Sequence, residues 1–191
     1  MSTYQSQYDT LLSYYSTQEN IVTLLRQHRL YFEMIPSLRR PADCLICVPL
    51  PVVKLASAPE GKNHTQLECD IAVVMCDPDW KVKIGREIFI FIHRPGEDFA
   101  TLLKRWRQVE VTLSDEYSLL LPIKYHNLLG DRADYLFPLF VTLDYTPSRI
   151  RRGLEGASLP YVNAELPKET IEPPSDDNPE RLENFVPDEP D

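Results

Sequence analysis

Four cysteines are the first side chains in this sequence whose type and spacing could bind a metal. Cys44 and Cys47 are separated by two residues, as zinc ligands often are, and Cys69 and Cys76 follow in the next segment. Zinc needs four ligands that converge tetrahedrally, usually from tight turns, whereas residues 44–47 are apolar and typical of a strand. Residues three or seven apart on a strand point to opposite faces. The pattern therefore predicts buried, reduced thiols, with no metal and no other cofactor.

Two aspartates and a lysine form a second candidate for chemistry. Asp70, followed by Asp79-Trp80-Lys81, resembles the acid and the Asp-x-Lys triplet with which one superfamily of metal-dependent nucleases shares a magnesium ion and activates water. In that superfamily the second acid lies within a following strand, whereas Asp79 stands in a proline turn only nine residues after Asp70. A nuclease-like enzyme that uses Asp70, Asp79 and Lys81 is therefore the alternative hypothesis, and it requires the three side chains to lie within reach of one metal ion.

No other catalytic set is recognisable. The four histidines lie in four separate predicted elements, and only His93 and His126, each at a strand end, could meet. No serine or cysteine has a nucleophile context such as Gly-x-Ser-x-Gly, and the six glycines form no phosphate-binding or dinucleotide loop. These absences count against an ordinary nucleotide-dependent enzyme.

A basic cluster at the end of a predicted helix is the main candidate for binding. The helix has one apolar stripe at i, i+3, i+4 and i+7, which runs from Phe99 to Trp106 and should be buried. Its remaining surface is expected to present basic side chains to solvent, and a second basic pair follows at the exit from the folded region. The predicted binding residues are Lys104, Arg105, Arg107, Arg151 and Arg152. They would contact a protein partner or an anionic surface, and the simpler interpretation is a solvated helix end.

The elements that must position these residues indicate an α+β fold. Alternating and β-branched runs predict strands at 44–50, 52–56, 66–76, 84–93, 109–113, 118–126 and 135–145. Runs 66–76 and 84–93 should pair as an antiparallel hairpin. Helices are expected at 8–15, at 16–35 behind a capping box of Ser16 and Glu19, and at 99–107. The prediction is a mainly antiparallel sheet of about five to six strands, with an N-terminal helix and one short helix packed on it.

Charge and proline divide the 191-residue chain into two parts. Residues 1–150 contain 16 Lys/Arg and 18 Asp/Glu, a net charge of −2, and are predicted to form one globular domain. Residues 151–191 contain 4 Lys/Arg and 11 Asp/Glu, a net charge of −7, and are predicted to be an acidic, proline-rich, disordered tail. Residues 160–191 should then be dispensable for folding. The whole-chain charge of −9 disfavours nucleic acid as a partner.

The sequence also bears on location. No run of about 18 apolar residues predicts a membrane span, and the polar N-terminus does not resemble a secretory signal. Reduced cysteines are typical of an intracellular protein, so a cytoplasmic location is expected.

The segment from Ile88 to Trp106, a strand, a proline turn and a short helix ending in tryptophan, resembles a stretch of the matrix proteins of negative-strand RNA viruses. The basic N-terminal arm and the Pro-Pro-x-Tyr motif of those proteins have no counterpart, and the chain is assigned to no family. The leading hypothesis is a non-enzymatic interaction or assembly protein, an adaptor or a viral-type structural protein. Its basic helix end would contact the partner, and self-association into a homo-oligomer stays open. The tail would solubilise the chain, bind a partner or cover the basic cluster.

Overall fold

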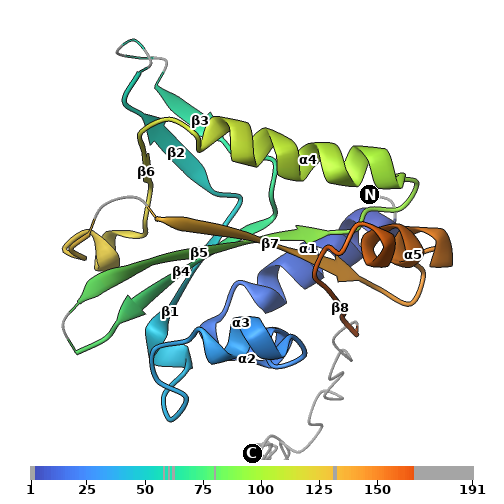
Figure 1. The fold of residues 1–191 in the computed structure, drawn as a ribbon, viewed down its shortest axis with the longest axis horizontal. Coiled ribbons are helices and arrows are strands. Elements are labelled where there is room, and N and C mark those ends of the chain that lie inside the picture. The colour runs from blue at the N-terminus through green and yellow to red at the C-terminus, as the bar shows by residue number, and fades with distance from the viewer. Residues whose placement is uncertain are drawn as a thin grey trace, which may run out of the picture.

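The computed structural model describes residues 3–57, 59, 61, 63–79, 81–130 and 133–165 and confirms the α+β class (Figure 1). Its centre is a five-stranded mixed sheet in the order β1-β4-β5-β7-β8. These strands are β1 (Leu45–Pro49), β4 (Ile71–Asp77), β5 (Val82–Ile92), β7 (Tyr135–Thr142) and β8 (Tyr161–Asn163). A separate three-stranded sheet has the order β3-β2-β6, with β2 (Val52–Leu55), β3 (His64–Gln66) and β6 (Tyr117–Leu119).

The strand pairing agrees with the predicted hairpin, but the strands that follow the hairpin in the main sheet pair in parallel rather than antiparallel. Strands β4 and β5 are antiparallel, with Ile71 opposite Ile90, as expected. Strands β5, β7 and β8 are parallel to one another, and their crossover connections carry helices, as parallel pairs require. The predicted strand 66–76 is divided between β3 and β4, because the chain bends at 68–70 before it enters the main sheet.

Three N-terminal helices, α1 (Thr3–Tyr15), α2 (Gln18–Leu25) and α3 (Arg29–Glu33), cover one face of the main sheet (Figure 1). The predicted helix 16–35 is two helices, because the His28 side chain accepts a hydrogen bond from the Tyr31 amide and caps α3. The cap of α2 is Thr17 rather than Ser16, whose hydroxyl bonds the preceding helix at the Leu12 carbonyl. The short helix expected at 8–15 is confirmed as part of α1.

The opposite face is covered by α4 (Phe99–Thr112), α5 (Ser148–Gly156) and the small sheet, which rises beside the C-terminal end of α4 (Figure 1). The expected burial of Trp106 is confirmed. The predicted strand 109–113 is wrong: Val109 lies three residues after Trp106, so it extends the same buried stripe and the helix continues through it. The predicted strand 118–126 is reduced to β6, because Pro122 is followed by the 3-10 turn η2 (Ile123–Tyr125).

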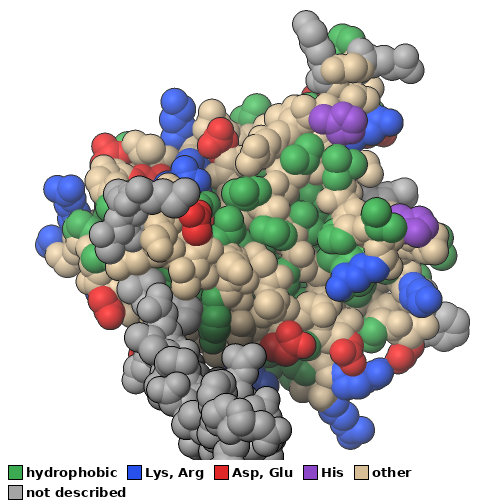
Figure 2. Space-filling model, turned by 180° about the vertical axis from the view of Figure 1, so that it is seen from behind, with side chains coloured by type: hydrophobic (Ala, Val, Ile, Leu, Met, Phe, Trp, Pro, Cys, Tyr) green, Lys and Arg blue, Asp and Glu red, His purple; other side chains and the backbone are tan. Residues whose placement is uncertain are grey.

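The face of the molecule seen from behind in Figure 2 carries both hydrophobic and charged side chains. Hydrophobic side chains lie over its middle, and most Lys and Arg side chains lie toward its margins. Among the described residues, no helix combines the length and the apolar character that crossing a bilayer requires.

The folded region continues beyond the expected boundary at residue 150. Ile150 and Leu154 of α5 are buried, and so are Val162 of β8 and Ala164 after it. Strand β8 pairs with β7 from Phe140 to Thr142 and forms one edge of the main sheet. Residues up to 165 therefore belong to the fold, and the predicted disorder of 166–191 falls outside the described residues.

This position of β8 changes the expected effect of truncation. We expect a chain that ends at Leu159 to be less stable to urea than one that ends at Glu165, by about 2–4 kcal/mol in the free energy of unfolding, because it loses the burial of Val162 and the pairing of β8. Equal unfolding midpoints for the two chains would show that β8 contributes nothing to the sheet.

Candidate functional site

Helix α4 positions the basic cluster that the sequence singled out. The Asp98 side chain caps it, accepting a hydrogen bond from the Thr101 amide at 2.7 Å. Lys104 and Arg107 are exposed, as expected. Arg105 is only 4% exposed, so its predicted solvent position is wrong. It lies three residues after Leu102 and four before Val109, on the buried stripe itself.

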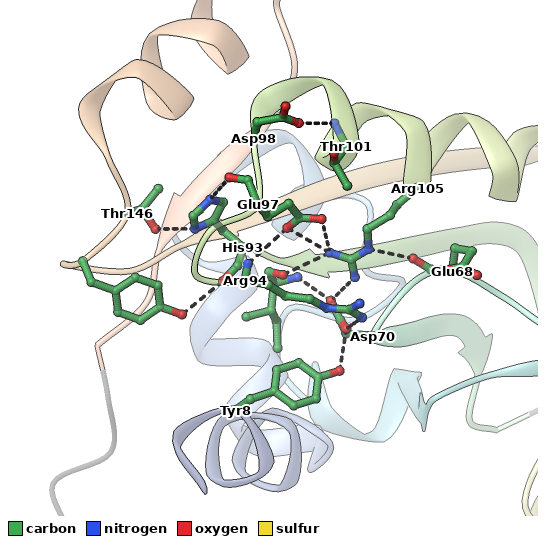
Figure 3. Close-up of polar contacts among 12 residues, drawn as sticks. Tyr8, Glu68, Asp70, His93, Arg94, Glu97, Asp98, Thr101, Arg105 and Thr146 are labelled. Atoms are coloured by element: carbon green, nitrogen blue, oxygen red, sulfur yellow. Dashed lines mark hydrogen bonds and ion pairs between the residues drawn. The ribbon is translucent and has the colours of Figure 1, made fainter. Parts of the chain in front are cut away.

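Asp70 is the partner that holds Arg105 beneath the helix. Asp70, the residue before β4, is completely buried, and its two carboxylate oxygens accept four hydrogen bonds (Figure 3). Oδ2 accepts from the Arg105 guanidinium at 2.7 Å and from the Ile92 amide at 2.6 Å. Oδ1 accepts from the Tyr8 hydroxyl at 2.6 Å and from Arg94 at 3.0 Å. This carboxylate is fully satisfied, and it ties α1, β5 and α4 together.

The Arg105 guanidinium is equally well paired. It donates to the Glu97 carboxylate at 3.3 Å, to the Glu68 carbonyl at 3.1 Å and to the Ile92 carbonyl at 3.2 Å (Figure 3). It also lies 5.5 Å from the centre of the Phe91 ring. A buried charge is tolerated only when it is paired and hydrogen-bonded, and here every part of the guanidinium has a partner. Arg105 is therefore part of the structure of α4, rather than a free cation on its surface.

Arg94 lies at the edge of this cluster and reaches the surface. Its side chain is 42% exposed, and it is ion-paired with Asp70 at 3.0 Å. Its guanidinium also lies over the Tyr8 ring, 5.6 Å from the centroid. Burial raises the pKa of the Tyr8 hydroxyl, and the neighbouring Asp70 adds to the effect. The hydroxyl therefore keeps its proton and remains a donor to Asp70.

A groove runs along one side of α4, above the charged cluster. It consists of two hollows of about 450 and 460 Å³ that share Glu68, Lys104 and Gln108. One hollow reaches the turn before α4, and its wall includes Arg94 and Glu97. The other reaches the open edge of β3. Its wall adds Thr65, Gln66, Arg107, Val111 and Thr112. We call this feature the α4 groove.

The second basic pair lies at the other end of α4. Helix α5 packs against the start of α4, where a Cβ on Gly153 would lie 2.9 Å from the Phe99 ring. The Arg151 guanidinium donates hydrogen bonds to the Leu143 carbonyl at 2.7 Å and to the side-chain oxygen of Asn163 at 3.2 Å. Arg152 is exposed. Neither arginine lines the α4 groove, so the five predicted binding residues do not form one surface.

The three residues of the nuclease alternative are not brought together. Asp70 precedes β4 and Asp79 follows it, so the two acids lie at opposite ends of that strand. Asp70 is occupied by two arginines, and Asp79 is ion-paired with Arg40 at 3.1 Å. Within the described ranges, no group of three or more His, Cys, Asp or Glu side chains is arranged to hold a metal ion. Asp70, Asp79 and Lys81 therefore do not meet the requirement of that alternative.

The four thiols are buried and unpaired, but their distribution differs from the prediction. Cys44 and Cys47 lie on the same side of the main sheet, facing the N-terminal helices, because Cys44 belongs to the 3-10 turn before β1 rather than to the strand. Cys69 and Cys76 face the opposite side. Burial raises the pKa of all four thiols, to about 12 for Cys47 and about 11 for Cys76, which leaves them protonated and unreactive near neutral pH.

His93 and His126 do not meet. His93 is buried just after β5, where its ring nitrogens lie 3.1 Å from the Glu97 carbonyl and 3.3 Å from the Thr146 hydroxyl (Figure 3). His126 is exposed and close in sequence to Leu129, which bridges to Val82 at the opposite end of β5.

A second cavity, of about 570 Å³, lies between the small sheet and β5. Glu87 is part of its wall and is only 2% exposed. Glu87 was not among the residues predicted from the sequence, although the pattern contained a signal. Phe89 and Phe91 point toward the core on the side of the main sheet that α4 and the small sheet cover. Glu87, two residues earlier, places a carboxyl group in the same row.

Similarity to known proteins assigns no role to these features. No protein-family model matches the chain, and no curated protein or solved structure is significantly similar to it.

Proposed function

We propose that this protein is a non-enzymatic interaction protein, and that its α4 groove binds an acidic segment of a protein partner. The observation that carries the proposal is the position of Lys104 and Arg107. Both are exposed and both line the groove along α4, a helix that the buried pair of Asp70 and Arg105 holds in place. A groove lined from the turn before α4 to Thr112 at its end suits an extended peptide segment, since several side chains of the ligand can be contacted along it.

The charges of the groove favour an acidic ligand. Its basic side chains are Arg94, Lys104, Arg105 and Arg107, and its acidic ones are Glu68 and Glu97. Glu97 is paired with Arg105 at 3.3 Å and Asp70 with Arg94 at 3.0 Å. Lys104 and Arg107 are then opposed only by Glu68 among the lining residues, which leaves a basic excess at the accessible surface. Complementary charges of this kind give specificity and faster association more than they give raw affinity.

The groove is also apolar at its β3 end. Val111 is 73% exposed there and lines the groove together with Thr112. The proposed segment therefore has acidic residues opposite Arg94, Lys104 and Arg107, and an apolar residue next to Val111. Because Asp70 and Arg105 hold α4 in place, the groove exists before binding, and little free energy is needed to order it.

Reversal of the two exposed charges tests the proposal. We expect the double substitution Lys104→Glu/Arg107→Glu to weaken binding of a fluorescent acidic peptide, corresponding to residues 166–191 of this chain, by about tenfold or more. The wild-type affinity should fall as salt is raised, because the charges are exposed. Fluorescence anisotropy measures both effects, and the peptide serves only as an acidic probe.

The matched control is Arg39→Glu/Arg86→Glu, which makes the same change in charge at two exposed arginines outside the groove. This control should bind the probe within about twofold of the wild type, since exposed charges far from a ligand are screened. Equal losses in both double variants would mean that only net charge matters and that the α4 groove is not the binding surface. If only the groove variant loses binding, capture from a host extract with the wild type and the two double variants identifies the partner.

A further inference from the structure

The cavity between the two sheets is a site distinct from the α4 groove. Its walls come from β2, β5 and β6, from Glu116 just before β6, and from the loop at Gly130. None of its lining residues belongs to the α4 groove. The lining residues that carry charge or a side-chain hydroxyl are Lys54, Lys83, Glu87, Glu116, Tyr117 and Ser118. A cavity with a few convergent polar groups is the usual form of a small-molecule site.

Glu87 is the unusual group in this wall. Its Oε2 accepts one hydrogen bond, from the Tyr117 hydroxyl at 2.9 Å. Asp70, the other buried acid, accepts four hydrogen bonds, two of which come from ion-paired arginines. Within the part of the chain that the structure describes, Glu87 forms no ion pair, although Lys83 lines the same cavity. A buried carboxyl with so few partners is costly for folding alone, and such groups concentrate at functional sites.

The surroundings of Glu87 favour its protonated form. Burial raises the pKa of the Glu87 carboxyl, and the Tyr117 hydrogen bond and the charge of Lys83 only partly offset that effect. A protonated carboxyl group can donate a hydrogen bond, which an ionised one cannot. Below the pKa of Glu87, the cavity presents two ammonium groups, from Lys54 on β2 and Lys83 on β5, together with a carboxyl group able to donate.

We propose that this cavity binds a small organic anion, whose carboxylate or phosphate group lies between Lys54 and Lys83 and accepts a hydrogen bond from the protonated Glu87 carboxyl. The two lysines line the same cavity from different sheets, so an anion between them would neutralise both. Glu116 faces the same space from the end that leads into β6 and leaves room for one net negative charge on the ligand.

The proposal fixes the sign of a pH dependence. An anion binds best when Glu87 carries its proton, so the affinity should fall as pH rises through the pKa of that carboxyl. Glu116 is the other carboxyl that faces the cavity, and it must be distinguished from Glu87 by substitution.

Lactate and dimethyl phosphate, each carrying a single negative charge from about pH 5 to 8, are the probes. We expect at least one of them, at constant ionic strength, to shift the amide NMR signals of Tyr117 and Gly130 and to bind more weakly with rising pH. Glu87→Gln, a neutral donor at every pH, should bind with an affinity that no longer depends on pH, whereas Glu116→Gln should keep the wild-type dependence. Lys54→Ala/Lys83→Ala should lose about tenfold or more in affinity.

Three results would overturn the proposal. One is the absence of any shift at Tyr117 and Gly130 with either anion. Another is tighter binding of the anion at higher pH, which contradicts the role of the Glu87 proton, or preferential binding of choline, which indicates a cation site. The third is an unchanged pH dependence in Glu87→Gln; if that variant does not fold, the lysine pair still decides the outcome. Lys104→Ala, which alters the α4 groove, should leave anion binding unchanged, so failure here is distinguishable from failure of the peptide proposal.

Discussion

Arg105→Ala should destabilise the protein by about 3–5 kcal/mol, a large fraction of the stability of a domain of this size. The substitution removes the cation that pairs with Asp70 at 2.7 Å and with Glu97 at 3.3 Å. Both carboxylates lie beneath α4, where water cannot replace the guanidinium. Urea unfolding monitored by circular dichroism measures the change, with the slope of the transition checked for two-state behaviour.

The neighbouring basic residues provide the control. Lys104→Ala and Arg107→Ala change the same helix at exposed positions, and each should alter the unfolding free energy by less than about 0.5 kcal/mol. Arg105→Lys should also be destabilising, because a lysine cannot reproduce the planar fork that serves four acceptors. A loss below about 1 kcal/mol in Arg105→Ala would show that the carboxylates find other partners and that the cluster does not hold α4.

Trp106→Ala is expected to cost a similar amount, about 3–5 kcal/mol, for a different reason. The indole is 6% exposed, and its ring centroid lies 5.9 Å from Phe91 and 6.5 Å from Phe89. Removing it opens a cavity between α4 and the main sheet that the surrounding rings cannot fill. Urea unfolding measures this effect too.

Val111→Ala is the matched substitution on the same helix, since Val111 is 73% exposed. It should change stability by less than about 0.5 kcal/mol. If Trp106→Ala proved as mild, α4 would not be anchored on the sheet by its apolar stripe. Arg105 and Trp106 share partners around Phe91, so the double variant should deviate from additivity.

The elements whose burial repeats with a regular period could be predicted from the sequence. The β4–β5 hairpin, the first part of α4 and the burial of Trp106 each follow from apolar spacing alone. Pairing direction does not, because a strand that is buried on both faces has the same composition in a parallel or an antiparallel neighbour. Strand β8 was missed because its three residues, 161–163, lie among prolines and acids, and only its position beside β7 makes it a strand.

The site was harder to predict than the fold, and Arg105 and Glu87 show why. Both are charged residues at positions that the period assigns to the core. Arg105 was expected to face solvent, and Glu87 was not among the predicted site residues. For Arg105 the correct choice depends on Asp70, which is 35 residues away in sequence. For Glu87 the correct choice depends on the small sheet, and nothing in the sequence of that sheet indicates that it encloses a cavity. A charged residue on a buried stripe is therefore the sequence feature that should direct attention to a site.

The parallel pairing of β5 with β7 also has a consequence for the order in which the chain can fold. Hairpin β4–β5 joins residues that are near neighbours along the chain, so it can form early and at little cost in chain entropy. Strand β7 can pair with β5 only after α4, β6 and η2 have been synthesised, because all of them lie between β5 and β7 in the sequence. During synthesis, the edge of β5 stays open until Thr142 has emerged, and the edge of β7 until Asn163 has. For that interval the nascent chain presents an unpaired, apolar strand edge, which is the period in which it is most exposed to aggregation or to a chaperone.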